Sequence, residues 1–581
     1  MTVTDVEVAI AGAGLLRVFN GAGVLDVSDV LVANRVCALG KESDEWVALA
    51  VALAVRALRG GSVCVDLSTI AGLVGADELP WPQPAAWLAA VRASPLLGAP
   101  PVLHLYDDRL LYLDRYWLEE KQVCHDLLAL LARRPAVELP VCERLFPAGF
   151  AEQREAAEIA LSQRVTVLTG GPGTGKTTTV ARLLALVAEQ AERAGNSRPR
   201  IALAAPTGKA AARLQEAVQL EVAKLDAVDR RRLEGLSAVT IHRLLGSKPA
   251  TSARFRHDRA NRLPHDVIVV DETSMVSLTL MARLLEAVRP DARLVLVGDA
   301  DQLASVEAGA VLADLVEGLS GRADVRVATL RTSHRFGASI GALADAIRVG
   351  DAEGALALLR SGDEHIEHFE LEAGDDPAGW LRAILLAHAL RLREAAVLGA
   401  ADVALSALDS HRLLCAHRRG PYGVAHWNTQ VQKWIADETG QPAWSEWYAG
   451  RPLLVTANDY GLRVYNGDTG VTVAGPDGLR AVIAGATGPL SFATSRLADV
   501  ETMHAMTIHK SQGSQADEVT VLMPPEDSRL LTRELFYTAL TRAKTKVRVV
   551  GSEASVRAAI ERRAVRASGL RLRLQTTASE T

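Results

Sequence analysis

The sequence predicts an α/β protein with two blocks of parallel sheet, a helical N-terminal region and a small β-rich insertion. Short apolar runs rich in Val, Ile and Leu recur from residue 150 onward, which is typical of strands buried on both faces of a parallel sheet. Between residues 450 and 500 the sequence alternates in period 2 and contains Asn-Gly-Asp and Pro-Asp-Gly, which indicates antiparallel hairpins. Within the first 125 residues, the stretch 46–58 instead places apolar residues at helical spacing.

Composition and charge limit the classes of protein that the chain can be. Its 581 residues are too many for one core, and 23% of them are charged, as in ordinary globular proteins. The net charge of -5 argues against a protein that coats nucleic acid with one basic face, although a narrow basic channel remains compatible with it. We find no run apolar enough for a transmembrane helix and no signal-peptide pattern, so we expect a cytoplasmic protein with no membrane partner.

The five cysteines are widely spaced and form no CxxC pair. An iron–sulfur cluster on four of them is the alternative to reduced structural thiols, and the spacing favours the thiols. The cysteines are Cys37, Cys64, Cys124, Cys142 and Cys415.

The elements follow from these patterns in chain order. Residues 46–58 predict a buried helix, and residues 103–113 predict a short hairpin. The polar C-terminal tail after Arg573 is expected to be disordered. The main parallel strands are predicted at VTVLTG, RIALAAPTG, DVIVVDE, ARLVLVGD and VTVLMP. The predicted domains are a helical region at 1–125, a first α/β domain at 126–332 with a short hairpin at about 247–264, a second α/β domain at 333–440 and 497–573, the insertion at 441–496 and the tail at 574–581.

The strongest chemical signal is the segment 170–177, GGPGTGKT, which matches the phosphate-binding pattern GxxxxGK[ST] between a predicted strand and a predicted helix. Glycines let backbone N–H groups turn toward phosphates, Lys176 places a charge on the β and γ oxygens, and the Thr177 hydroxyl can ligate Mg²⁺. The flanking strand and helix disfavour the alternative, a glycine-rich turn without function. The predicted ATP-binding residues are Gly170, Gly171, Pro172, Gly173, Thr174, Gly175, Lys176, Thr177 and Thr178.

Polar residues in four further segments fit the chemistry of hydrolysis. Asp271 and Glu272 follow a buried strand, where Asp271 would hold Mg²⁺ and Glu272 would deprotonate the attacking water; a helix N-cap is the alternative. Gln302 can hydrogen-bond the γ-phosphate or its water, although its motif alone also fits a simple turn. Arg335 and Arg542 could neutralise the transferred phosphoryl group from the second domain, unless they are only solvated charges.

In order and spacing, these segments resemble the motifs of superfamily 1 helicases over residues 150–550. The form of motif V after a β-rich insertion is similar to the 5′→3′ branch. Further segments resemble the RecD family, the alpha subunit of exodeoxyribonuclease V. The helicase motifs beyond GGPGTGKT are APTGKAAARL, VVDETSM, LVGDADQLASV, the segment with Arg335, MTIHKSQGSQADEV and LFYTALTRAK, and the RecD-like segments are LYLDRYWLEE, LLCAHRRGPYGVAHWN and NDYGLRVYNGDTG.

The resemblance implies a fold, an activity and partners. It implies two RecA-like P-loop motor domains that hold ATP and Mg²⁺ between them, an SH3-like β-barrel insertion and a helical N-terminal domain that binds partner subunits. The implied activity is ATP-dependent 5′→3′ DNA unwinding with RecB-like and RecC-like subunits in double-strand break repair and recombination. It further implies that Gln153 reads adenine and that DNA is contacted by Pro206, Thr207, Lys209, His242, Thr507 and His509, for which helix caps or surface groups are the alternative.

Other interpretations stay open at this point. A stand-alone 5′→3′ helicase is one alternative, but stand-alone relatives carry helix-hairpin-helix extensions that residues 1–145 lack. A scaffold with a relic nucleotide site is another. No paired-carboxylate nuclease signature stands out, so DNA degradation would belong to a partner. The basic segment 247–264 is either a hairpin at the duplex junction or a mobile loop. The basic segment 529–573 could contact phosphates, expose a solvated helix face or bind a subunit.

Overall fold

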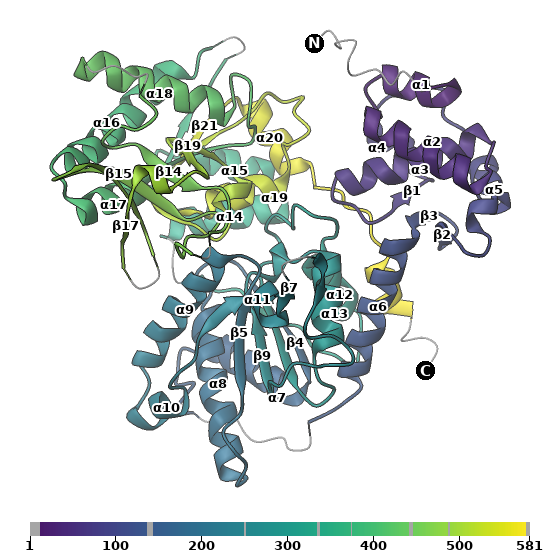
Figure 1. Cartoon of the computed structure of the whole chain (residues 1–581), viewed down its shortest axis with the longest axis horizontal. Coiled ribbons are helices and arrows are strands. Elements are labelled where there is room, and N and C mark those ends of the chain that lie inside the picture. Colours follow the sequence, from purple (N-terminus) through teal and green to yellow (C-terminus); the bar gives the residue numbers. More distant parts are fainter. Residues whose placement is uncertain are drawn as a thin grey trace.

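The structure is a computed structural model that describes residues 12–135, 143–248, 251–333, 337–372, 375–440, 445–459, 461–485 and 488–576. Within these residues the chain forms an N-terminal module, two α/β domains and an inserted antiparallel sheet (Figure 1). The predicted α/β class is confirmed, and the five apolar runs form strands of the two parallel sheets.

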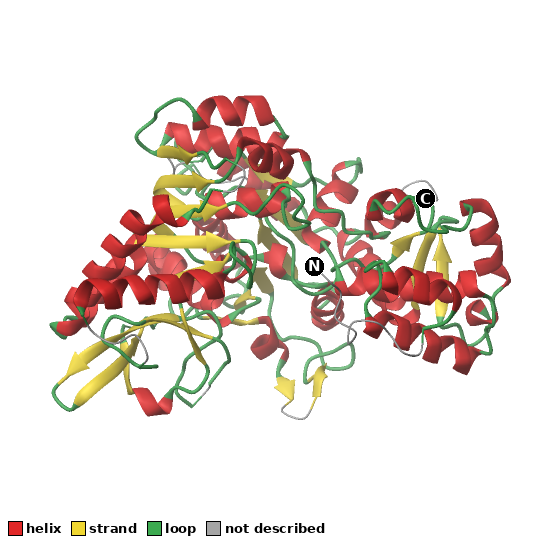
Figure 2. Cartoon of the chain, turned by 90° about the horizontal axis from the view of Figure 1, so that it is seen from above, coloured by secondary structure: helices red, strands yellow, loops and turns green. Residues whose placement is uncertain are grey.

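The N-terminal module is built around one apolar helix. That helix, α3, begins after Asp44, whose side chain accepts a hydrogen bond from the Trp46 backbone, and it buries most of residues 47–54. The buried helix and the hairpin predicted from the sequence are therefore confirmed. Helices surround a small sheet that lies apart from the α/β domains (Figure 2). The elements are α1 (Gly14–Gly21), α2 (Val27–Gly40), α3 (Glu45–Arg59), β1 (Val65–Asp66), α4 (Ile70–Val74), α5 (Pro84–Ala93), β2 (Leu103–Tyr106) and β3 (Leu110–Leu113).

The first α/β domain contains a parallel sheet in the order β11-β4-β10-β9-β5-β6. Its central strands are buried on both faces, which explains their unbroken apolar runs. The strands are β4 (Val165–Gly170), β5 (Ile201–Ala205), β6 (Ala238–Thr240), β9 (Val267–Val270), β10 (Arg293–Gly298) and β11 (Ala328–Leu330). The helices are α7 (Ala151–Ser162), α8 (Lys176–Arg193), α9 (Gly208–Ala223), α10 (Ala227–Arg232), α11 (Ile241–Leu245), α12 (Leu278–Ala287) and α13 (Val311–Ser320).

The second α/β domain contains a parallel sheet in the order β12-β21-β20-β13-β19. Parallel strands require crossover connections, and helices supply several of them. The strands are β12 (Ile366–Phe369), β13 (His411–Cys415), β19 (Ala505–Thr507), β20 (Ala516–Leu522) and β21 (Ala543–Val550). The helices are α14 (Ala338–Val349), α15 (Ala352–Leu359), α16 (Ala378–Val397), α17 (Ala401–Ser410), α18 (Val424–Thr439), α19 (Arg533–Leu540) and α20 (Glu553–Glu561).

The insertion is an antiparallel sheet in the order β17-β16-β15-β14-β18. The hairpin prediction is confirmed, but the described strands include no pairing of β17 with β18 that would close a barrel. β18 lies beyond the predicted boundary at 496, yet it belongs to the inserted sheet because it pairs with β14 at the start of the insertion. The strands are β14 (Pro452–Val455), β15 (Thr469–Gly475), β16 (Gly478–Ile483), β17 (Leu490–Ala493) and β18 (Val500–Thr502).

Two helices tie the N-terminal module to the first α/β domain. α6 (Asp114–Leu131) runs through the predicted boundary at 125 and packs against α12. α21 (Leu570–Thr576) packs against α13 and α6, so the chain returns from the second domain to this junction (Figure 1). The expectation of a disordered tail from residue 574 is wrong for residues 574–576. Leu570 and Leu574 lie one helical turn apart and are fully buried, which outweighs the polar composition of the tail.

The segment 247–264 forms a short hairpin in which β7 (Ser247–Lys248) pairs with β8 (Thr251–Phe255). The hairpin is therefore present, and its contact with a duplex junction stays a prediction. No helix in the described part of the chain is long and apolar enough to cross a membrane.

The described cysteines are free thiols inside the protein core. Burial raises the pKa of Cys37 to about 11 and is also the main cause that raises the pKa of Cys64, Cys124 and Cys415. Cys142 lies outside the described residues. Residues 12–135, 143–248, 251–333 and the later described ranges contain no cluster of three or more His, Cys, Asp or Glu side chains placed to hold a metal ion.

Glu120 is a buried carboxylate where α6 meets the C-terminal segment. It accepts hydrogen bonds from the Tyr112 hydroxyl at 2.9 Å, the Arg573 Nε at 2.9 Å and the Gly569 N–H at 3.2 Å. We expect Glu120→Ala to cost about 3–5 kcal/mol of local stability, because it removes the anionic partner of a buried guanidinium. Faster native-state hydrogen exchange in α6 and α21 would show this loss. The exposed pair Arg571–Glu317 provides the control, since Arg571→Ala should change exchange little.

Candidate ATP site at the seam of the two α/β domains

The loop between β4 and α8 has the backbone geometry that a phosphate site needs. Gly173 and Gly175 have φ angles of 83° and 87°, in the left-handed region that favours glycine. A Cβ atom on Gly170 would lie 2.6 Å from the Leu330 carbonyl oxygen, so no larger residue fits there. The loop leads directly into the N-terminus of α8, where the free N–H groups and the helix dipole favour anions.

The side chain of Lys176, the first residue of α8, extends to the beginning of this loop. Its Nζ donates hydrogen bonds to the carbonyl oxygens of Gly170 at 2.6 Å and Gly171 at 2.8 Å. Burial raises the pKa of Asp271 and Asp299, and the charge of Lys176 opposes both shifts, which places the amine close to both acids. The amine is thus held where β and γ phosphates would enter, and it can exchange carbonyl partners for phosphate oxygens.

The two predicted carboxylates lie at the end of β9, at the same sheet edge as the phosphate loop. β10 separates β9 from β4, and all three strands are parallel, so their carboxyl ends open on one crevice. Burial and the neighbouring Glu272 raise the pKa of Asp271 to about 6, although Lys176 opposes the shift. Glu272 has a φ of 50°, a left-handed conformation that costs energy in a non-glycine residue and is common at functional sites.

Gln302 lines the same cavity as the phosphate loop, but its side chain is hydrogen-bonded to a residue of its own domain. Its side chain is only 7% exposed, and its Nε2 donates to the Asp299 Oδ2 at 2.8 Å. Burial raises the pKa of Asp299, while Lys176 and the hydrogen bond from Gln302 lower it. The predicted contact with a γ-phosphate would therefore require the Gln302 amide to leave Asp299.

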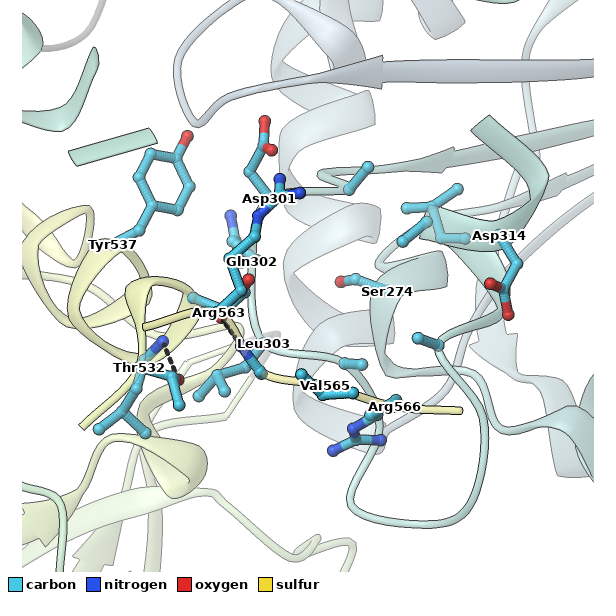
Figure 3. A pocket seen from close by; sticks show the side chains of 18 of the residues that line it. Ser274, Asp301, Gln302, Leu303, Asp314, Thr532, Tyr537, Arg563, Val565 and Arg566 are labelled. Atoms are coloured by element: carbon cyan, nitrogen blue, oxygen red, sulfur yellow. Dashed lines mark hydrogen bonds between the residues drawn. The ribbon is translucent and has the colours of Figure 1, made fainter. Parts of the chain in front are cut away.

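Helix α19 of the second domain closes the seam against the first domain. The Tyr537 hydroxyl donates to the Asp299 Oδ2 at 3.2 Å, and it would lie 3.0 Å from a Cβ on Gly171. The Leu303 N–H donates to the Thr538 hydroxyl at 2.9 Å. Figure 3 shows Tyr537 opposite Gln302 in the cavity, which has a volume of about 2270 Å³ and extends to the N-terminal module. Tyr537 and Thr538 were not predicted, although both lie in the same motif as Arg542.

Arg542 follows α19 and is buried at this seam. Its side chain is 4% exposed and donates from Nε to the Thr538 carbonyl at 3.0 Å. Burial lowers its pKa, whereas the charges of Glu272 and Asp299 in the first domain raise it. The second domain therefore brings one of the two predicted arginines close to the carboxylates of the phosphate site. Arg335 lies outside the described residues.

Gln153 holds the phosphate loop from the side of α7. Its side chain is 3% exposed, and its Nε2 donates to the Thr174 carbonyl at 3.3 Å. A Cβ on Gly175 would lie 3.2 Å from the same nitrogen. This contact orients the amide beside the loop, where an adenine could replace the carbonyl as its partner.

The residues predicted to contact DNA lie on both α/β domains. Pro206 directly follows β5, and the Thr207 hydroxyl caps α9 by accepting from the Ala210 N–H at 3.2 Å. Thr507 ends β19 and accepts from the Lys510 N–H at 3.2 Å. Thr207 thus has the capping role that the sequence left as an alternative, whereas Thr507 accepts its hydrogen bond within the turn after β19. Each hydroxyl can still donate to a phosphate.

The two predicted histidines differ in exposure. His242 is exposed, and its ring lies 5.8 Å from that of Phe255 on the β7–β8 hairpin. His509 is half-buried, and burial, together with the charges of Arg566 and Arg418, lowers its pKa. His509 lines the cavity at the seam.

Lys209 joins the first domain to the inserted sheet. Its Nζ donates to the Gly467 carbonyl at 2.9 Å, beside Tyr465, whose side chain packs on Gly208. Sequence reasoning missed this contact, because the two segments are 258 residues apart.

Burial and the nearby charges of Arg213 and Arg412 lower the pKa of Lys209 to about 7. The free protein therefore loses the charge above that pH, whereas a bound phosphate would restore it by proton uptake. We expect the affinity for single-stranded DNA to fall about tenfold from about pH 6.5 to about pH 8. Lys209→Arg should remove this dependence, because arginine stays charged. Equal pH slopes for the two proteins, measured by fluorescence anisotropy, would contradict the assignment.

The fold and the seam define a two-domain P-loop ATPase of the superfamily 1 helicase class. Comparison with protein families finds the RecBCD enzyme subunit RecD N-terminal domain at residues 21–110, an AAA domain at 153–308 and a UvrD-like helicase C-terminal domain at 502–550. The matched ranges lie in the N-terminal module, the first α/β domain and part of the second α/β domain, respectively.

Two curated relatives match nearly the whole chain, and a third matches part of it. RecBCD enzyme subunit RecD from Mycobacterium tuberculosis is 77% identical over 99% of this chain and 100% of its own length. The same subunit from Mycolicibacterium smegmatis is 71% identical over 97% and 99% of the two chains. The ATP-dependent RecD2 DNA helicase of Deinococcus radiodurans is 31% identical over 76% of this chain and 55% of its own length. The chain belongs to the RecD family of RecBCD enzyme subunits and is an ATP-dependent superfamily 1 helicase.

Proposed function

We propose that this chain is the 5′→3′ motor subunit of a RecBCD-type helicase–nuclease and works with RecB-like and RecC-like subunits on DNA ends in the cytoplasm. The observation that carries the proposal is the seam itself, where the phosphate loop, the carboxylates after β9 and Arg542 from the second domain converge. The near-complete match to RecD subunits supports the choice of partners. In this assignment residues 1–125 bind partners, and the inserted sheet is the SH3-like 2B domain.

ATP hydrolysis is assigned to residues from both domains. Lys176 neutralises the β and γ phosphates, and Glu272 accepts the proton of the attacking water. Arg542, with Arg335 as the second candidate, stabilises the charge that develops on the transferred group. Asp271 and Thr177 offer carboxylate and hydroxyl oxygens that suit Mg²⁺, and Asp271 follows β9 at the sheet edge that also carries the phosphate loop. The metal would supply charge neutralisation between the phosphates.

Movement along DNA follows from closure of the same seam. Pro206, Thr207, Lys209 and His242 would grip the strand from the first domain, and Thr507 and His509 from the second. Closure of the two domains over ATP would bring their two sets of DNA contacts closer together, and hydrolysis would let them separate again. Each ATP cycle would then move the protein one step along the strand. The grip is on phosphates and is therefore independent of sequence.

The proposal is tested by purifying the native chain and identifying what accompanies it. We expect RecB-like and RecC-like subunits in a stable complex, and we expect the chain to unwind substrates with a 5′ single-stranded tail. An isolated chain in the extract would reject the subunit assignment. Preferential unwinding from a 3′ tail by a complex whose RecB-like motor is inactivated would reject the assigned polarity.

A further inference from the structure

A short linker joins the two α/β domains, and its first residues lie beside the phosphate loop. β11 ends at Leu330, which is in register with Gly170 on β4, and α14 of the second domain begins at Ala338. Of the residues between them, 331–333 and 337 are described. The Ser333 hydroxyl donates to the Pro172 carbonyl in the phosphate loop at 3.1 Å. Two chain connections run between the domains, this linker and the segment that leads back to α21, and this linker is the one that contacts the phosphate loop. Rotation of one domain against the other therefore bends the linker beside the nucleotide site.

Glu152, in the first turn of α7, holds the first residues of this linker. Its Oε2 accepts hydrogen bonds from the backbone N–H groups of Arg331 at 2.9 Å and Thr332 at 3.1 Å. Its Oε1 accepts from the Thr332 hydroxyl at 3.0 Å. Partial burial raises the pKa of Glu152, but the donated hydrogen bonds outweigh burial, and the net shift is downward. The carboxylate is therefore charged at neutral pH and bound to two successive residues of the linker.

Gln153, the next residue on α7, contacts the phosphate loop. Gln153 donates to the Thr174 carbonyl of the phosphate loop, while Glu152 holds the linker. The first turn of α7 thus contacts both the loop that receives the phosphates and the chain that connects the two domains. Ser333 completes the junction by joining the linker to the loop directly.

We propose that Glu152 is a positioning residue for ATP hydrolysis, which anchors the start of the interdomain linker to the phosphate loop so that nucleotide binding is converted into domain closure. Glu152 does not touch the nucleotide in this role. It fixes the pivot about which the second domain brings Arg542 to the site. The simpler alternative is that its charge only stabilises the N-terminus of α7.

The test compares Glu152→Ala and Glu152→Gln with Glu155→Ala in the full-length protein. Glu155 lies on the same helix and forms an exposed pair with Arg326 at 2.6 Å, so it reports on general loss of charge from α7. We expect Glu152→Ala to lower the kcat of DNA-stimulated ATP hydrolysis about tenfold, because three hydrogen bonds to the linker are lost. The KM for ATP should stay within about twofold, because binding by the loop is retained.

Glu152→Gln separates anchoring from helix stabilisation. A glutamine oxygen can still accept from the linker N–H groups, so the variant should keep kcat within about threefold of the parent. A kcat for Glu152→Ala equal to that of Glu155→Ala would overturn the proposal. Equal kcat losses in Glu152→Ala and Glu152→Gln, each with a lowered Tm, would overturn it in favour of helix stabilisation.

Discussion

Lys176→Gln is expected to abolish ATP hydrolysis stimulated by single-stranded DNA, with a loss of about 10³-fold or more in kcat. The glutamine amide can still bond to the Gly170 and Gly171 carbonyl oxygens that now hold the lysine, so the loop should keep its shape. What disappears is the positive charge that faces the β and γ oxygens. Turnover measured by phosphate release at saturating DNA and ATP gives the result directly.

A surface lysine provides the matched control for this loss. Lys224 forms an exposed pair with Glu221 at 2.6 Å, away from the phosphate loop, and Lys224→Gln should hydrolyse ATP at the parent rate. Retained turnover in Lys176→Gln would show that the nucleotide is hydrolysed elsewhere, and the assigned site would be rejected.

Arg542→Ala is expected to lower kcat by about 10³-fold or more, while ATP still binds. The side chain is held by the carbonyl oxygens of Thr538 and Ser514, close to the carboxylates of the opposite domain. An arginine in this position acts when the seam closes, so its loss should affect the chemical step more than ATP binding. Arg542→Lys should fail to restore the rate, because one ammonium group cannot replace the planar fork.

Burial of Arg542 makes a folding control necessary. Lys544, two residues further on, forms an exposed pair with Asp517 at 3.0 Å, and Lys544→Ala should keep both rate and fold. Unchanged circular dichroism and ATP affinity in Arg542→Ala would show that its fold is intact. A kcat within about tenfold of the parent would then contradict the role of Arg542 in charge stabilisation.

The local parts of the site could be predicted because short segments determine them. The phosphate loop needs its glycines for backbone geometry and its lysine for charge, so the sequence from Gly170 to Thr177 defines it. The carboxylates after β9 follow from a buried strand and a polar end. Parallel strand order then brings β4, β10 and β9 to one edge, as expected for this class of sheet.

The remaining contacts could not be predicted because they join distant segments. Tyr537 meets Asp299 across 238 positions, and Lys209 meets Gly467 across 258. A spacing pattern within one segment carries no information about such pairs. The expectation of disorder at residues 574–576 is wrong for a related reason. Its composition is polar, but Leu574 has a partner surface on α13 that only the folded chain provides.

The central claim is that the second domain delivers a guanidinium group to a nucleotide held by the first. A crystal structure of the protein with single-stranded DNA, ADP and an aluminium fluoride analogue of the transferred phosphoryl group tests it most directly. We predict that the Arg542 guanidinium lies within hydrogen-bonding distance of the fluoride atoms, with Lys176 on the opposite side. If Arg542 instead kept its bonds to Thr538 and Ser514 while the analogue was bound, the claim would be contradicted.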